Sequence, residues 1–270
     1  MRRGVCILVA CLAAVSAQAA ESAAEKGKRL IGEALHALGG QAFLNMSDRT
    51  ETGHAFSFDH SGVSGLALAK IYTRYLAAPP AGKAGVRERE AFFAHLSTKV
   101  EDSAILLTEE GGWELTYRGA LPVADERYAN FEDSTRKSIF YILRNRLNEP
   151  GMDFYWMGTD KAENRPVDKV DITDDARETV TVYLSQDDKL PVRQSFKRRN
   201  PQFKDFDTEV SIFGKYHDVG GGVKWPFNIR REKNGDGTFE IFSDSVEINK
   251  NLADDLFTIP GSMKILPKPK

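Results

Sequence analysis

The first periodic segment of the chain predicts an amphipathic helix. Between Ala24 and Leu38, apolar residues recur at positions that share one stripe of a helix. Gly39 and Gly40 follow directly, and glycines at this point are typical of a helix that ends in a left-handed cap. We therefore expect one helix over residues 24–38.

After this helix the apolar residues alternate with polar ones, which is the pattern of half-buried strands. Alternation is clear around Phe56, Trp113 and Val182. Short turn sequences join strands into hairpins over residues 103–118 and 180–196. Because connections this short do not allow parallel crossovers, neighbouring strands should be antiparallel.

Two irregularities mark the last strands. Pro226 interrupts the alternation of residues 223–229 on its polar face, and it cannot donate a ladder hydrogen bond, so it predicts an edge strand or a bulge. In residues 238–248 the apolar positions change from odd to even numbers after Ile241. That change of phase predicts a β-bulge.

A second helix is expected near the middle of the chain. Asp133 and Ser134 are good N-caps, and apolar residues then keep a helical spacing as far as Leu147, just before Pro150 and Gly151. With about ten strands and two helices, the fold class is α+β with a strongly curved antiparallel sheet. No repeat or linker divides residues 20–263, which we expect to form a single domain, and residues 264–270 are expected to fray.

The N-terminus resembles an export signal. Arg2 and Arg3 precede an apolar run that is too short to span a membrane, and small residues follow it. We expect residues 1–19 to be a signal peptide that is cleaved after Ala19, which places the mature protein in the periplasm. The alternative is a lipid anchor at Cys11, because Leu8 to Cys11 matches a lipobox, but the apolar run before it is short.

Composition narrows the function further. Both cysteines, Cys6 and Cys11, lie in the predicted leader, so the mature chain has no disulfide and must be stable on its own core. The formal net charge is −2, and it becomes −4 when the two positive charges of Arg2 and Arg3 are removed. This balance of mixed charges gives no support for nucleic-acid binding.

No motif predicts catalysis, a cofactor or a metal site. Gly62 to Leu66 resembles a nucleophile elbow but lacks its second glycine, and Asn234 to Gly237 lacks the glutamate of a calcium loop. None of the five histidines forms a zinc-binding pair at helical spacing. Carboxylates are abundant, so a hidden acid/base pair in an envelope hydrolase stays open as an alternative.

Three segments resemble the C-terminal half of LolA-like proteins, the carriers and sorting proteins of outer-membrane lipoproteins. They are residues 190–193, 216–226 and 254–260, the last ending in Phe257-Thr258-Ile259-Pro260. The resemblance implies an incomplete antiparallel barrel, or half-barrel, around an apolar concave face, with the two helices as a lid. Relative to compact carriers, residues 77–83 and 160–168 look like extra loops.

These observations favour a periplasmic carrier that binds a lipid or an acylated protein in an apolar cavity, without catalysis or cofactor and with transient contact to a membrane surface. The alternative is a periplasmic regulator or sensor domain that binds an envelope protein partner. Apolar residues on the alternating strands are the candidates for the cavity, namely Phe56, Phe58, Val182, Phe213, Trp225 and Phe227.

Overall fold

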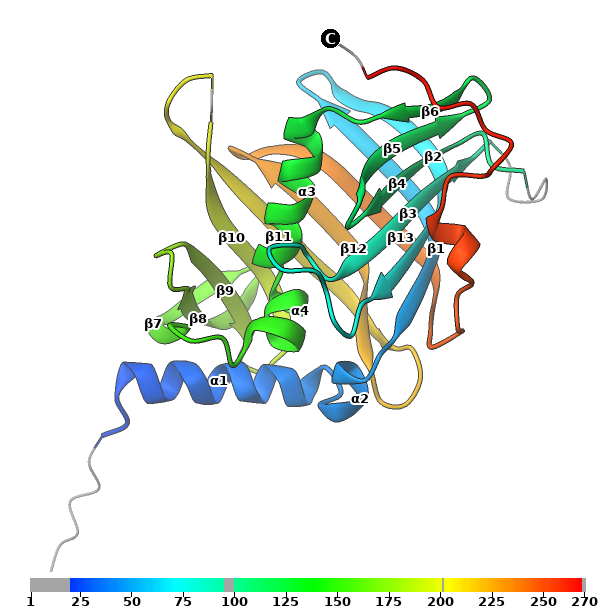
Figure 1. Cartoon of the computed structure of the whole chain (residues 1–270). Helices are drawn as coiled ribbons and strands as arrows, with labels where there is room; N and C mark the ends of the chain where they lie inside the picture. Colours follow the sequence, from blue (N-terminus) through cyan, green and yellow to red (C-terminus); the bar gives the residue numbers. More distant parts are fainter. Residues whose placement is uncertain (1–19, 95–99, 201, 269–270) are drawn as a thin grey trace, which may run out of the picture.

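The computed structural model describes residues 20–94, 100–200 and 202–268, so the predicted leader and the lipid anchor at Cys11 lie outside the described residues. Thirteen strands form one sheet, and each strand is antiparallel to its neighbours (Figure 1). Side by side, the strands are β6 (Gly119–Pro122), β5 (Gly111–Thr116), β4 (Ser103–Thr108), β3 (Val86–Phe93), β2 (Gly62–Tyr75), β1 (Asp48–Asp59), β13 (Asp236–Ile248), β12 (Lys224–Lys233), β11 (Phe206–Asp218), β10 (Pro191–Arg199), β9 (Thr179–Ser185), β8 (Arg165–Thr173) and β7 (Asp153–Ala162).

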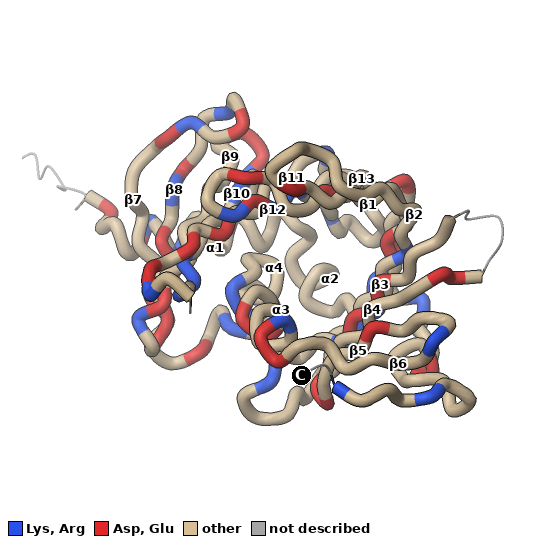
Figure 2. The backbone as a smooth tube through the Cα atoms, turned by 90° about the horizontal axis from the view of Figure 1, so that it is seen from above, with Lys and Arg blue, Asp and Glu red and all other residues tan. Residues whose placement is uncertain are grey.

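The sheet curls strongly but does not close into a barrel. Its edge strands, β6 and β7, are connected by α3 (Asp125–Lys137), α4 (Ile139–Tyr141) and the π-helical turn η2 (Ile142–Arg146), which lie across the open side (Figure 2). The α+β class and the curved antiparallel sheet are thus confirmed. The sheet has thirteen strands rather than about ten, partly because residues 160–168, expected to be an extra loop, contain the ends of β7 and β8.

The first helix agrees with its prediction. Helix α1 (Ala23–Ala37) begins with a capping box between Ser22 and Glu25, and its apolar stripe is buried. Gly27 lies against the backbone of β7, where a Cβ would come within 2.9 Å of Phe154 and Trp156 atoms. Gly40 has a positive φ and precedes the short helix α2 (Gln41–Leu44).

The second helix begins earlier than its sequence suggested. We expected a cap at Asp133 and Ser134, but α3 already starts at Asp125, and Ser138 has an extended conformation that separates α3 from α4. Helix α3 is mostly polar and has no continuous apolar stripe, so its first two turns gave no periodic signal. The Ile139 amide donates to the side chain of Gln194 at 2.8 Å, which ties the start of α4 to β10.

Pro226 lies on an inner strand rather than an edge strand, but in a part of that strand that is paired on one side only. Strand β12 lies between β11 and β13, and Pro226 is buried and pairs in register with Tyr216. The pairing between β12 and β13 begins only at Asn228, so the missing amide of Pro226 leaves no gap in that ladder. The bulge expected after Ile241 is confirmed, because Asp244 is the extra residue between the partners of Thr52 and Gly53.

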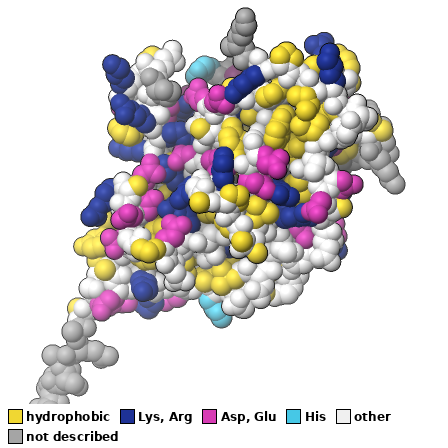
Figure 3. All heavy atoms as spheres, in the orientation of Figure 1, with side chains coloured by type: hydrophobic (Ala, Val, Ile, Leu, Met, Phe, Trp, Pro, Cys, Tyr) yellow, Lys and Arg dark blue, Asp and Glu magenta, His cyan; other side chains and the backbone are white. Residues whose placement is uncertain are grey.

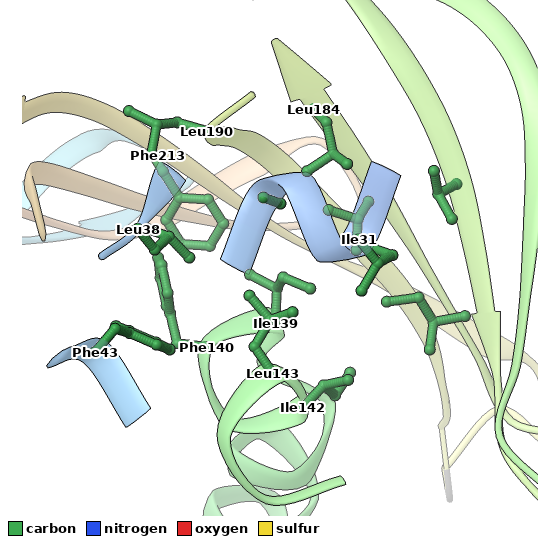
Figure 4. Close-up of a cluster of buried hydrophobic side chains, with 14 of the residues drawn as sticks. Ile31, Leu38, Phe43, Ile139, Phe140, Ile142, Leu143, Leu184, Leu190 and Phe213 are labelled. Carbon is green, nitrogen blue, oxygen red and sulfur yellow. The ribbon is translucent and has the colours of Figure 1, made fainter. Parts of the chain in front are cut away.

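The main hydrophobic core lies on the concave face of the sheet. Side chains from α1, α2, α4 and η2 meet those of β7–β11 there, and Figure 4 shows Phe140 between Phe43 and Phe213, near Leu38. The ring centroids of Phe140 and Phe213 lie 5.0 Å apart. None of the helices in the described ranges is long and apolar enough to cross a membrane.

A second core lies on the convex face of β3–β6, beneath the C-terminal segment. Phe257 of the 3₁₀-helix η3 (Asp254–Phe257) is buried there against Leu106 and Leu115. Figure 3 shows hydrophobic side chains gathered over this part of the molecule. The tail that we expected to fray from Lys264 instead follows β6, because the Ala120 amide donates to Lys264 and the Leu266 amide donates to Ala120, each at 2.8 Å.

Candidate binding trough

The register of the strands defines which side chains face inward. Paired residues share a face, so the inward set passes from Phe213 on β11 through Ile229 and Ile241 to Ala55 on β1 and Ala67 on β2. We call the inner surface of β12, β13 and β1–β4 the trough. Helices α1 and α4 pack over the other part of the concave face, on β7–β11.

Inward residues of the trough differ in burial, since Ile241, Ala55 and Ala69 are buried while others are not. Solvent reaches a set of apolar residues that all face inward and remain only half-buried, namely Phe92, Ile105, Phe227, Ile229 and Phe239. Against the helices, by contrast, inward residues such as Val182 and Leu184 have no exposed surface. An apolar surface that stays open to solvent inside a fold is typical of a binding site.

Helix α3 forms a strap between the two ends of the sheet. On one side Arg198 of β10 bonds to Asp133 and Ser134 of α3. On the other side Tyr128 donates to the Thr108 carbonyl at 2.6 Å, and the amide of Ala84 donates to Glu132 at 2.6 Å. Burial and the neighbouring Glu132 carboxylate raise the pKa of Tyr128, so this phenol stays a hydrogen-bond donor.

A row of polar side chains, which we call the polar row, crosses the trough at the end where the helices pack. Arg49, Thr73 and Glu88 are register neighbours on β1, β2 and β3, and Glu51, Ile71 and Glu90 form the next row. Arg49 donates to Tyr75 and Thr73 and lies 3.4 Å from Glu51, and its side chain is only 9% exposed. The concave face therefore combines apolar residues with buried charges.

Glu88 and Glu90 differ from Arg49 because neither carboxylate forms a hydrogen bond or an ion pair within the described part of the chain. Burial, followed by the charge of Glu90, raises the pKa of Glu88 to about 7. Arg231 of β12 opposes this rise, although β13, β1 and β2 separate its strand from β3. Four strand spacings amount to about 19 Å along a flat sheet, so the curl brings β12 and β3 towards each other.

Beside this row lie buried donors that have no acceptor. The guanidinium carbon of Arg49 lies 4.0 Å from the ring centre of Trp225, and neither Arg49 Nε nor Trp225 Nε1 has a hydrogen-bond partner. The guanidinium of Arg144 stacks over Tyr75 at 4.2 Å and donates to the Phe43 and Met46 carbonyls, yet its Nε has no acceptor. Burial lowers the pKa of Arg144.

Two open grooves lie at opposite ends of the trough strands. One, of about 480 Å³, runs between α2, the β11–β12 turn and the end of β13, and Val223, Val246 and Ile248 line it. The other, of about 490 Å³, lies where β3 ends beside β2, between Leu68 and Phe93. In the described ranges no three histidine or carboxylate side chains come together as a metal site.

The structure brings four of the six candidate residues to the concave face. Val182, Phe213 and Trp225 are buried in the main core, and Phe227 packs against it while half-exposed. Phe56 and Phe58 point to the convex face, because Phe56 stacks edge-on with Phe242, which is 36% exposed, and Phe58 lies near Gly237. These two residues therefore do not belong to the trough.

The sequence reading missed the polar row. Charged residues recur two positions apart, at the period of a strand, in two segments: Arg49 and Glu51 in one, Glu88 and Glu90 in the other. That period was visible, but charged residues with a period of two are normally assigned to the solvent face. Only the curl of the sheet shows that they point inward.

No family model matches the chain, and no curated protein matches it. Solved structures, by contrast, resemble this chain in fold. An outer membrane lipoprotein-sorting domain, as it is described, from Vibrio parahaemolyticus is 12% identical and has a TM-score of 0.58, covering 87% of this chain and 97% of that chain. A DUF1329 family protein from Desulfovibrio piger is 11% identical with a TM-score of 0.56, covering 88% and 98%.

A LolA superfamily protein from Nitrosomonas europaea is 11% identical and has a TM-score of 0.48, covering 86% of this chain and 97% of that chain. The two structures with the higher scores share the fold over almost their whole length. The resemblance found in the sequence is confirmed at this level. The chain shares the fold of these two structures, an open antiparallel half-barrel with helices on its concave side.

Proposed function

We propose that this protein is an exported carrier that binds a lipid, or the acyl part of a lipid-modified protein, in the trough and releases it chemically unchanged. The observation that carries the proposal is the partly solvent-accessible apolar surface of the trough, where Ile229 and Phe239 face inward and remain half-exposed. Burying a methylene of a ligand against such a surface contributes about 0.8 kcal/mol. A long acyl chain is therefore retained without any covalent bond.

The fold supports this proposal, since a structure with the same fold is described as a lipoprotein-sorting domain. The site works by shape and burial, so it needs neither cofactor nor catalytic group. Export to the periplasm is part of the proposal and rests on the leader predicted at residues 1–19.

Native mass spectrometry tests the proposal on protein purified from an envelope fraction, before and after organic extraction. We expect an added mass of lipid or acylated peptide that extraction removes. A clean mass together with a stable protein partner in a pull-down would favour the regulator hypothesis instead.

A matched pair of variants on β2 locates the ligand. Ala67 is half-buried and faces into the trough, whereas Val63 of the same strand is 61% exposed and pairs with Phe58 on the convex face. Ala67→Trp should fill the trough and reduce ligand occupancy several-fold, while Val63→Trp should leave it unchanged. Equal occupancy in both variants would place the ligand elsewhere.

A further inference from the structure

The polar row of the trough contains unmet hydrogen-bonding capacity of both signs. Glu88 and Glu90 are partly accessible acceptors without a donor, and their carboxylates project from the same face of β3. Trp225, which is 3% exposed, carries a buried indole Nε1 without an acceptor, and the Nε of Arg49, which is 7% exposed, forms no hydrogen bond and lies 3.4 Å from a Glu51 oxygen. Because buried polar groups are almost always paired in native proteins, this combination requires an explanation.

Charges of the protein itself do not complete this row. Arg49 is already engaged with Tyr75, Thr73 and Glu51. Arg231 stacks on Phe239, with its guanidinium carbon 5.5 Å from the ring centre, and forms no ion pair among the residues that the structure describes. Carboxylates in this enclosed place are costly when ionised, and a cation from outside the chain would offset that cost.

The geometry points to an amphiphile with a zwitterionic head group as the ligand of the trough, its ammonium between Glu88 and Glu90 and its acceptor oxygens towards Arg49 and Trp225. This inference rests on the proposed function, because the acyl chain of the same molecule would lie along Ile229 and Phe239. It adds that the polar row selects among lipids by their head groups.

Four probes with the same chain length test the inference on the unmodified protein, by competition with a fluorescent fatty-acid probe. They are a lysophosphatidylethanolamine, an anionic lysophosphatidylglycerol, a neutral monoacylglycerol and an alkylamine. We expect the lysophosphatidylethanolamine to bind at least tenfold more tightly than each of the others. An alkylamine that binds as tightly as the lysophosphatidylethanolamine would show that Arg49 and Trp225 do not contact the head group. A lysophosphatidylglycerol that binds as tightly would show that Glu88 and Glu90 do not. Either result contradicts the inference.

The double variant Glu88→Gln with Glu90→Gln provides the second measurement. It should lower affinity for the lysophosphatidylethanolamine about tenfold and leave the monoacylglycerol unaffected. Glu240→Gln, the same change on the convex face of β13, is the control and should alter neither. A preference that survives the double variant overturns the inference, whereas binding of no probe at all overturns the proposed function itself.

Discussion

The two parts of the concave face are built from the same kind of strand but are covered differently. Over β7–β11, α1 and α4 fill the concavity, and inward residues such as Phe213 are buried. Over β12, β13 and β1–β4 the strap α3 spans the opening, and inward residues such as Ile229 stay half-exposed. The first part provides the stability that the second lacks, so a binding surface can stay open within a folded chain.

The largest expected effect is a difference in the free energy of unfolding between two variants, one in each part of the concave face, at residues that are paired across neighbouring strands. Phe213 and Ile229 lie opposite each other on β11 and β12, one buried and one half-exposed. Phe213→Ala should reduce the free energy of unfolding by about 3–5 kcal/mol, because it opens a cavity in the packed core. Ile229→Ala should cost only about 1 kcal/mol, since it deletes a side chain that solvent already reaches. Urea denaturation measures both, and equal losses would contradict the distinction.

An effect of intermediate size should appear in the pH dependence of the free energy of unfolding, through Glu88 in the trough. Because the pKa of Glu88 is raised to about 7 in the folded state, that state binds more protons than the unfolded chain between roughly pH 4.5 and 7. Stability from this group is therefore fully present at low pH and is lost as the pH rises through 7. A difference of one pH unit between the folded and unfolded pKa of a carboxyl corresponds to about 1.4 kcal/mol.

The variant Glu88→Gln tests this pH dependence. The charged groups that act on the Glu88 carboxyl in the unmodified protein are Glu90, Arg231, Arg49 and Glu51. The variant should be more stable than the unmodified protein above pH 7 and should lose less stability between pH 5 and 8. Urea midpoints measured across that range report the difference. The prediction fails if the variant and the unmodified protein show parallel pH profiles.

The smallest effect concerns the strap. Tyr128→Phe removes the hydrogen bond to the Thr108 carbonyl and the one to Glu132, and should cost about 1 kcal/mol. Because these bonds attach α3 to the β4 side of the trough, amide hydrogen exchange should become faster in α3 and stay unchanged in α1. Tyr117→Phe, at a residue that is 87% exposed, is the control.

Features that depend on neighbouring residues were predicted correctly from the sequence, whereas the face of the sheet on which a side chain lies was not. The helix over residues 24–38, the two hairpins and the bulge after Ile241 depend on neighbouring residues, and all are present. Alternation separates two faces of a strand but does not say which one is concave. For this reason Phe56 was assigned to the cavity although it lies outside, and the charged row went unnoticed. The start of α3 was missed because a polar strap has no apolar stripe.

The pairing of β1 with β13 has a consequence for synthesis. These strands are adjacent in the middle of the sheet, and residues 60–235, with the other eleven strands of the described chain, lie between them in sequence. A polypeptide that emerges from the ribosome or a translocon with its N-terminus first cannot complete this ladder until its final segment is released. The strands on either side of this pair can each begin to form hairpins, but the β1–β13 ladder that joins them forms last.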